Sequence, residues 1–218
     1  MSLTHRKPRP LRRHEATFRD DRLFIVACDD TYAPKQYFDF FEIPRVKVHV
    51  VPTEDTRSAA QHVLNRLLQY EHEEDDELWL VLDTDHYASG SHLPGFITAI
   101  SEAKQRGVNI ALSKPCFEIW LLLHHLEETS VTVLADASEV EALLRATLGE
   151  YNKKGLKAKH YPIENLPDAI IRAERLDATV EGGDIPDGNT SRIYLLWKAI
   201  IDKALPSQLP DPLAELKQ

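Results

Sequence analysis

The sequence has 218 residues, of which 43% are hydrophobic, and a formal net charge of −9. These totals suit a globular protein with its own core and exclude a uniformly basic nucleic-acid coat, although a local basic patch can still bind nucleic acid. Two cysteines, Cys28 and Cys116, are too few for a disulfide framework or a cysteine zinc site. No apolar run is long enough to span a bilayer, and none follows the basic N-terminus, so we expect a cytoplasmic protein with no membrane partner.

Residues 1–20 are basic and interrupted by prolines. They contain six lysines and arginines against two acids, with prolines at positions 8 and 10. Because such a segment has too few apolar residues to pack, we expect it to form a flexible basic arm.

Four short apolar segments that follow have the composition of buried strands. They cover residues 22–28, 46–51, 78–82 and 108–112. Predicted helices alternate with them: one begins at Pro34 and ends before Pro44, one is capped by Thr56 or Ser58 and ends before the acidic run 71–77, and one covers about 94–106. The alternation predicts an α/β domain over residues 21–126, with a mostly parallel sheet of about four strands flanked by helices.

The second half of the sequence has helical patterns and little strand signal. Helices are predicted at about 115–126, 137–149, 167–176 and 190–203. We therefore expect residues 127–218 to form a C-terminal helical extension packed on the first domain.

Acidic residues follow two of the predicted strands. Asp83 and Asp85 are two positions apart, so both side chains point to one side of an extended chain while Thr84 points away. Ligands bind at the carboxyl ends of parallel strands, and carboxylate oxygens suit Mg²⁺ or Mn²⁺. The motif therefore indicates a metal site, which Asp29 or Asp30 would join if the two strands are neighbours. Alternatively, these carboxylates cap a turn or pair with a surface lysine.

The residues after the fourth predicted strand open the next helix. Pro115 suits a first helical turn, and Glu118 in that turn complements the helix dipole. The Glu118 carboxylate can equally face the metal site, and spacing alone does not decide. Lys114, at the strand end, can stabilise charge on a phosphate or neutralise the acids without a metal.

The loop 151–160 contains four lysines and no acid, at positions 153, 154, 157 and 159. Together with the basic arm, it is where phosphates can be held against the overall negative charge. The alternative is an ordinary solvated loop.

Several of these segments together resemble the RloB-like family. They are Tyr37-Phe38, the run Asp83–His86, the run Ser113–His124 with its core Pro-Cys-Phe-Glu-x-Trp-Leu-Leu-Leu-His, and Asn189-Thr190 before an apolar helix. The resemblance covers most of the chain and implies a Toprim-like fold, the metal-dependent fold of topoisomerases, primases and several nucleases. It also implies that Asp83 and Asp85 bind the metal. His86 is a further candidate because it directly follows these acids in the sequence.

The sequence departs from the family pattern after the first strand. Where the family has Cys-Glu-Gly, this chain has Cys28-Asp29-Asp30, so the glutamate that the family uses for acid/base work and metal contact is one methylene shorter. Asp29 can still bind metal, but a small displacement of a catalytic group can lower a rate by orders of magnitude. Lys114 stands where the family commonly has asparagine.

These observations predict a metal-dependent nuclease that hydrolyses phosphodiester bonds in DNA or RNA. The expected catalytic residues are Asp29, Asp83, Asp85 and Glu118, with Mg²⁺ or Mn²⁺ held by Asp83, Asp85 and Asp29. The expected nucleic-acid-binding residues are Lys114, Lys153, Lys154, Lys157 and Lys159. The resemblance implies a bacterial phage-defence or restriction system with an ATPase partner of the ABC or AAA type. The alternative is a catalytically degenerate Toprim-like module that binds nucleic acid or an ATPase without cutting.

Overall fold

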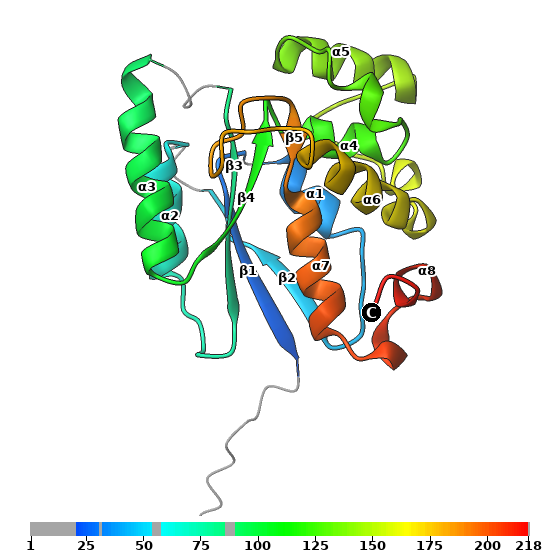
Figure 1. Ribbon diagram of the computed structural model, residues 1–218. Helices are drawn as coiled ribbons and strands as arrows, with labels where there is room; N and C mark the ends of the chain where they lie inside the picture. Colours follow the sequence, from blue (N-terminus) through cyan, green and yellow to red (C-terminus); the bar gives the residue numbers. More distant parts are fainter. Residues whose placement is uncertain (1–20, 31, 54–57, 86–89, 218) are drawn as a thin grey trace, which may run out of the picture.

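A five-stranded sheet forms the centre of the computed structural model, which describes residues 21–30, 32–53, 58–85 and 90–217 (Figure 1). The strands are β1 (Arg22–Cys28), β2 (Val46–Val50), β3 (Glu77–Asp83), β4 (Asn109–Lys114) and β5 (Thr190–Ser191). Their spatial order is β2-β1-β3-β4-β5. The first four strands are parallel, and β5 pairs antiparallel with β4. The predicted mostly parallel α/β sheet is confirmed, but it has five strands rather than about four.

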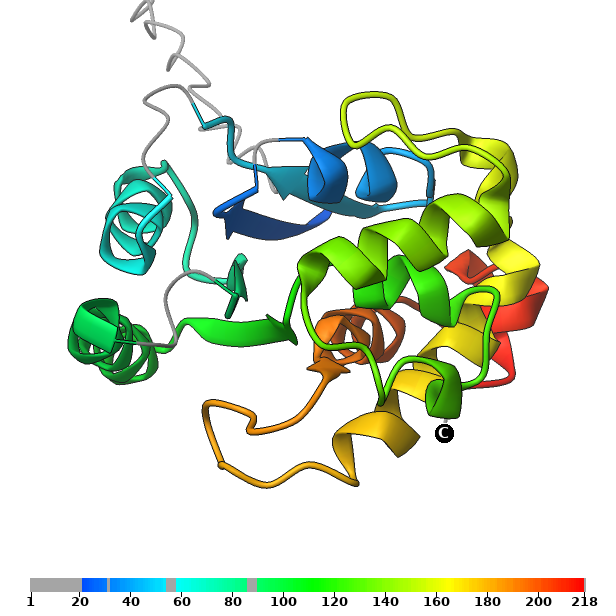
Figure 2. The ribbon, with the colours of Figure 1, turned by 90° about the horizontal axis from the view of Figure 1, so that it is seen from above.

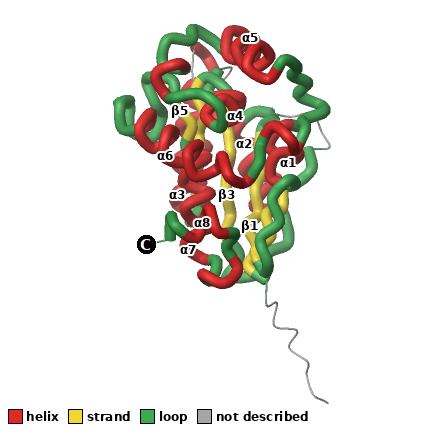
Figure 3. Tube along the Cα trace, turned by 90° about the vertical axis from the view of Figure 1, so that its right-hand side faces the viewer, coloured by secondary structure: helices red, strands yellow, loops and turns green. Residues whose placement is uncertain are grey.

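Helices cover both faces of this sheet (Figures 1 and 3). They are α1 (Ala33–Phe38), α2 (Ala60–Gln69), α3 (Leu93–Gln105), α4 (Glu118–Leu123), α5 (Ala137–Leu148), α6 (Leu166–Asp177), α7 (Ile193–Lys203) and α8 (Asp211–Ala214). Helices α2 and α3 lie on one face, whereas α1, α4 and α7 lie on the other, with α6 packed against α4 and α7. Seen from above, α5 lies beside α4 on the same side of the sheet (Figure 2).

The side chains of β1 and β3 alternate between two apolar cores. Phe24 and Val26 of β1 pack with Val81 of β3 on the side of α1, α4 and α7. Ile25 of β1 packs with Leu80 of β3 against α2 and α3. Successive side chains of a strand point to opposite faces, so a strand covered on both faces becomes continuously apolar, which is how these two segments read in the sequence.

The larger of the two cores joins the N-terminal and C-terminal halves of the chain. It contains residues of β1 and α1 together with residues of α6, α7 and α8, and its largest side chains include Trp120 and Trp197. The helices after residue 126 therefore share a core with the sheet. The proposed boundary between residues 126 and 127 stays a prediction.

Several predicted helices are shorter than expected, and the first of them, α1, ends at Phe38 rather than just before Pro44. The predicted helix 115–126 is α4, which begins only at Glu118, because β4 extends to Lys114 and the residue before a proline disfavours helical backbone angles. Pro115, which follows a cis peptide bond, lies in the turn between β4 and α4 rather than in a first helical turn. The predicted helix 190–203 is α7 preceded by β5, where Thr190 pairs with Lys114.

The predicted basic arm, residues 1–20, lies outside the described residues. Among the helices that the structure describes, none is long and apolar enough to cross a membrane.

Candidate metal centre

A cleft of about 740 Å³ lies where β1 and β3 end. The charged residues that line it are Asp29, Asp30, Asp83, Asp85, Glu118, Glu141, Lys153 and Lys154. Strands β1 and β3 are neighbours, as the predicted convergence of their acidic ends requires. The cleft therefore collects acids from two strand ends, from the start of α4 and from α5, together with two lysines of the loop 151–160.

The backbone around Asp83 and Asp85 is fixed to the end of β4. The nitrogen of Thr84 donates to the carbonyl oxygen of Ser113 at 3.0 Å, and the nitrogen of Asp85 donates to that of Pro115 at 3.1 Å. Asp83 and Asp85 line the cleft, whereas Thr84 is buried and does not. Their side chains thus lie on one side of the chain, as their spacing predicts.

Asp29 and Asp30 differ in what their carboxylates do. Asp29 accepts a hydrogen bond from the nitrogen of Asp83 on one oxygen and from the nitrogen of Asp30 on the other, each at 3.0 Å. Asp30 accepts from the nitrogens of Tyr32, at 2.8 Å, and Ala33, at 3.4 Å, where α1 begins. Asp29 therefore joins the ends of β1 and β3, while Asp30 holds the start of α1 and remains at the cleft.

Glu118 is 1% exposed and is the first residue of α4. Its Oε1 atom accepts a hydrogen bond from the Tyr151 hydroxyl at 2.5 Å and lies 3.4 Å from the Lys153 ammonium. Its Oε2 atom is buried and has no hydrogen-bond partner among the described residues. Both interpretations of Glu118 are thus compatible with its place: it begins a helix and it faces the cleft.

Lys153 lies between two acids of the cleft. Its Nζ atom is 3.4 Å from Oδ2 of Asp30 and 3.4 Å from Oε1 of Glu118. Burial alone would lower the pKa of Lys153, but the charges of Glu118 and Asp30 outweigh burial and raise it above its usual value. Lys153 is therefore a permanent cation inside an acidic cleft.

Asp83 and Asp29 ionise with difficulty, because their pKa values are raised. Burial, together with the charges of Asp29 and Glu118, raises the pKa of Asp83 well above its usual range. Burial likewise raises the pKa of Asp29 to about 7, although backbone hydrogen bonds oppose the shift. Like charges forced together out of water are costly, and a cation between them removes that cost.

The donor set of the cleft fits a hard divalent cation. It consists of carboxylate oxygens, as Mg²⁺ and Mn²⁺ prefer, and one of them, Glu118 Oε2, is buried without a hydrogen bond. In the arrangement seen, however, the described histidines, cysteines and acids form no group of three that is already placed to hold a metal. The candidate ligands are Asp83, Asp85 and Glu118, which line the cleft together.

Comparison with known proteins assigns the chain to a family. The sequence model of the RloB-like protein family matches residues 24–200. The chain belongs to the RloB-like family. Comparisons with curated proteins and with solved structures gave no significant match. The matched range covers β1 to most of α7, and so includes every cleft residue of this family member.

The five lysines predicted to bind nucleic acid lie in different places. Lys153 and Lys154 line the cleft, with the Lys154 ammonium 5.1 Å above the ring of Tyr32. Lys157 and Lys159 form ion pairs with exposed Glu150. The ammonium of Lys114 donates to the carbonyl oxygens of Pro186 and Asp187, at 3.1 and 2.8 Å, and so ties β4 to the loop before β5.

Sequence reasoning missed Glu141, which lines the cleft, and Tyr151 and Gln36, which contact the cleft residues Glu118 and Lys153. None of these three residues belongs to a motif, although Tyr151 is the first residue of the loop 151–160. Only the fold shows that Tyr151 reaches Glu118 and that Glu141 borders the cleft. His86 lies outside the described residues.

Proposed function

We propose that this RloB-like protein is a divalent-metal-dependent nuclease that hydrolyses phosphodiester bonds of DNA or RNA. The observation that supports the proposal best is the meeting of Asp83, Asp85 and Glu118 in one cleft with two lysines. Acids alone would repel a phosphate backbone, and lysines alone would bind it without cutting it. A cleft with both suits a metal held by carboxylates beside a strand held by cations.

Each residue then has a defined task. Asp83, Asp85 and Glu118 would hold Mg²⁺ or Mn²⁺, which supplies a Lewis acid for the scissile phosphate and for an attacking water. Asp29 acts as a positioning residue, because its carboxylate holds the backbone nitrogen of Asp83. Lys153 and Lys154 would neutralise the phosphates of the bound strand.

The wider setting of the proposal rests on the family resemblance alone. We infer a role in a bacterial phage-defence or restriction system, in the cytoplasm, with an ABC or AAA type ATPase as partner. The Toprim-like description of the sheet is part of the same proposal.

Cleavage assays with acid variants test the proposed activity. Plasmid DNA and a folded RNA are incubated with Mg²⁺ or Mn²⁺ and with the wild type, the double variant D83N/D85N or the control D184N. Asp184 is a suitable control because it is exposed and pairs with Lys104 of α3. We expect the double variant to lose at least about 100-fold in rate, as when charge stabilisation is removed from an active site, with D184N unchanged. Equal cleavage by the double variant and the wild type would refute the site.

One observation favours the alternative, a catalytically degenerate Toprim-like module that binds without cutting. Lys153 already neutralises Asp30 and Glu118, as a metal would. The double variant D29E/D30G restores the family residues at both positions. A non-catalytic module should remain inactive after this change, whereas a weakened nuclease should gain cleavage rate.

A further inference from the structure

The ammonium group of Lys153 lies in the acidic cleft and contacts Glu118, one of the proposed metal ligands. It lies 3.4 Å from an oxygen of Asp30 and 3.4 Å from an oxygen of Glu118, which are 5% and 1% exposed. An ammonium ion and a divalent cation both bind carboxylate oxygens, so they compete when they share one. Glu118 is the shared residue here.

The loop that carries Lys153 is held down by specific contacts. The Gln36 side chain of α1 donates to the carbonyl oxygen of Lys153 and accepts from the nitrogen of Leu156, both at 3.0 Å. The hydroxyl of Tyr151 at the start of the loop donates to Glu118. Hydrogen bonds thus connect the segment 151–156 to α1 and to α4.

A second, independent observation shows that the lysine does not complete this site. Oε2 of Glu118 is buried at the cleft and has no hydrogen-bond partner among the described residues, although Lys153 and Tyr151 both contact Oε1. A buried carboxylate oxygen without a partner is costly. It points to a ligand that Lys153 does not replace.

We propose that Lys153 is a resident counter-ion that a divalent cation displaces from Glu118, and that the segment 151–156 moves away with it. The proposal rests on the proposed metal site. The displaced ammonium then becomes available for a phosphate of the substrate, so the cleft gains a second phosphate-binding cation, beside Lys154, only when the metal is present. Lys153 would in this way couple metal binding to substrate binding.

Lys154 provides a matched control for charge. It is the next residue in the same loop and lines the same cleft, but its ammonium lies over the ring of Tyr32, 5.1 Å from the ring centre. Replacing either lysine by methionine removes one positive charge from the cleft. Only the change at position 153 removes the competitor for Glu118.

Titration with Mn²⁺ tests the proposal without any activity assay. The free Mn²⁺ is followed by electron paramagnetic resonance at about pH 8, where carboxylates are mostly ionised. We expect K153M to bind Mn²⁺ at least about tenfold more tightly than the wild type, because it removes the ammonium that competes for Glu118, whose side chain is only 1% exposed. K154M should stay within about twofold of the wild type, as expected of a lysine at the exposed rim.

The outcomes separate this proposal from the metal site itself. If K153M binds Mn²⁺ no more tightly than the wild type does, or if K154M gains as much as K153M, the displacement is refuted while the metal site stands. Absence of binding by the wild type, K153M and K154M alike would refute the metal site as well.

Two further measurements test the displacement of Lys153 if K153M does not fold. Q36A, which releases the loop but keeps both lysines, should also tighten Mn²⁺ binding. In the wild type, Mn²⁺ should speed amide hydrogen exchange at residue 156, whose N–H donates to the side-chain oxygen of Gln36. Slower or unchanged exchange there would contradict the movement.

Discussion

The carboxylate of Asp29 accepts a hydrogen bond from the backbone nitrogen of Asp83 at 3.0 Å, so the end of β1 holds the first acid of the Asp-Thr-Asp motif in place. The second oxygen of Asp29 accepts from the nitrogen of Asp30. Asp29 is therefore bound to backbone on both oxygens, which makes it a support for Asp83. The shorter side chain at position 29 therefore acts on the site by setting the position of Asp83.

Asp29 should make stability depend on pH in the metal-free protein. Its pKa of about 7 lies above the value of 3.8 expected for an unfolded aspartate, because burial disfavours the charged form. The folded state thus keeps a proton that the unfolded state loses, so the contribution is present at low pH and is lost as the pH rises toward 7. We expect the unfolding free energy of the wild type, relative to D29N, to fall by about 1–2 kcal/mol between about pH 5 and pH 7. Urea unfolding at several pH values, with metal chelated, measures the difference, and a constant difference would contradict the prediction.

Removal of the Tyr151 hydroxyl should destabilise the protein. This hydroxyl donates to Glu118 at 2.5 Å, and hydrogen bonds to buried charged groups contribute about 1.5–3 kcal/mol. Y151F should therefore lower the melting temperature by several degrees, at about 2–4 °C per kcal/mol for a chain of this size. Y32F is the control, since Tyr32 lines the same cleft but is 42% exposed. Equal melting temperatures for Y151F and Y32F would show that the contact contributes little.

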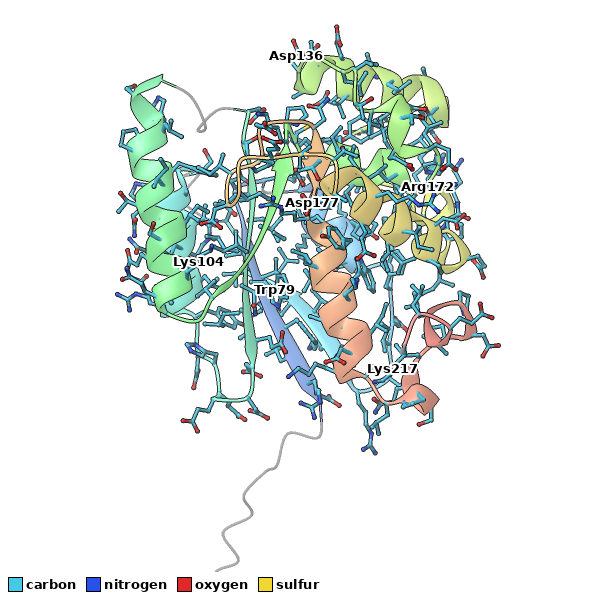
Figure 4. The ribbon with its side chains drawn as sticks, in the orientation of Figure 1. Trp79, Lys104, Asp136, Arg172, Asp177 and Lys217 are labelled. Atoms are coloured by element: carbon cyan, nitrogen blue, oxygen red, sulfur yellow. The ribbon has the colours of Figure 1, made fainter. Side chains whose placement is uncertain are left out.

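Asp177 is expected to hold β5 against α6. One of its oxygens accepts from Arg192 at 2.9 Å and from Thr190 at 3.2 Å, and the other accepts from Tyr194 at 3.0 Å. D177A leaves these partners unpaired at a site where Asp177 and Arg192 are only 15% and 17% exposed, so it should cost about 2–4 kcal/mol. The exposed pair Lys104 and Asp184 is the control, and K104A should cost less than about 1 kcal/mol (Figure 4 labels Asp177 and Lys104). Denaturant unfolding measures the free energy of unfolding of both variants. Similar losses for D177A and K104A would contradict the role of Asp177.

The fold was largely predictable because its central strands, β1 and β3, are apolar on both faces. Leu80 and Val81 pack on opposite sides of β3, which leaves a continuous apolar run between acids. Strand β5 could not be predicted in the same way, because it has two residues and exists through its pairing with Ser113 and Lys114. Its sequence carries no signal apart from that pairing.

The site was predictable where it depends on strand ends and not where it depends on contacts between distant segments. Neighbouring strands bring Asp29 and Asp83 together, as their positions after apolar runs suggested. The contacts of Lys153 with Asp30 and Glu118 depend on how the loop 151–160 folds back over α1, which Gln36 fixes from a position 117 residues away. No local sequence pattern indicates such a contact.

A crystal structure of the wild type soaked with Mn²⁺ tests the proposed metal site most directly. Anomalous scattering would locate the metal. We predict an anomalous peak about 2.2 Å from carboxylate oxygens of Asp83 and Glu118, within the range of oxygen distances to divalent cations, with the Lys153 ammonium displaced from Glu118. At saturating Mn²⁺, a structure without a peak at Asp83, Asp85 or Glu118, and with Lys153 still between Asp30 and Glu118, would contradict the account.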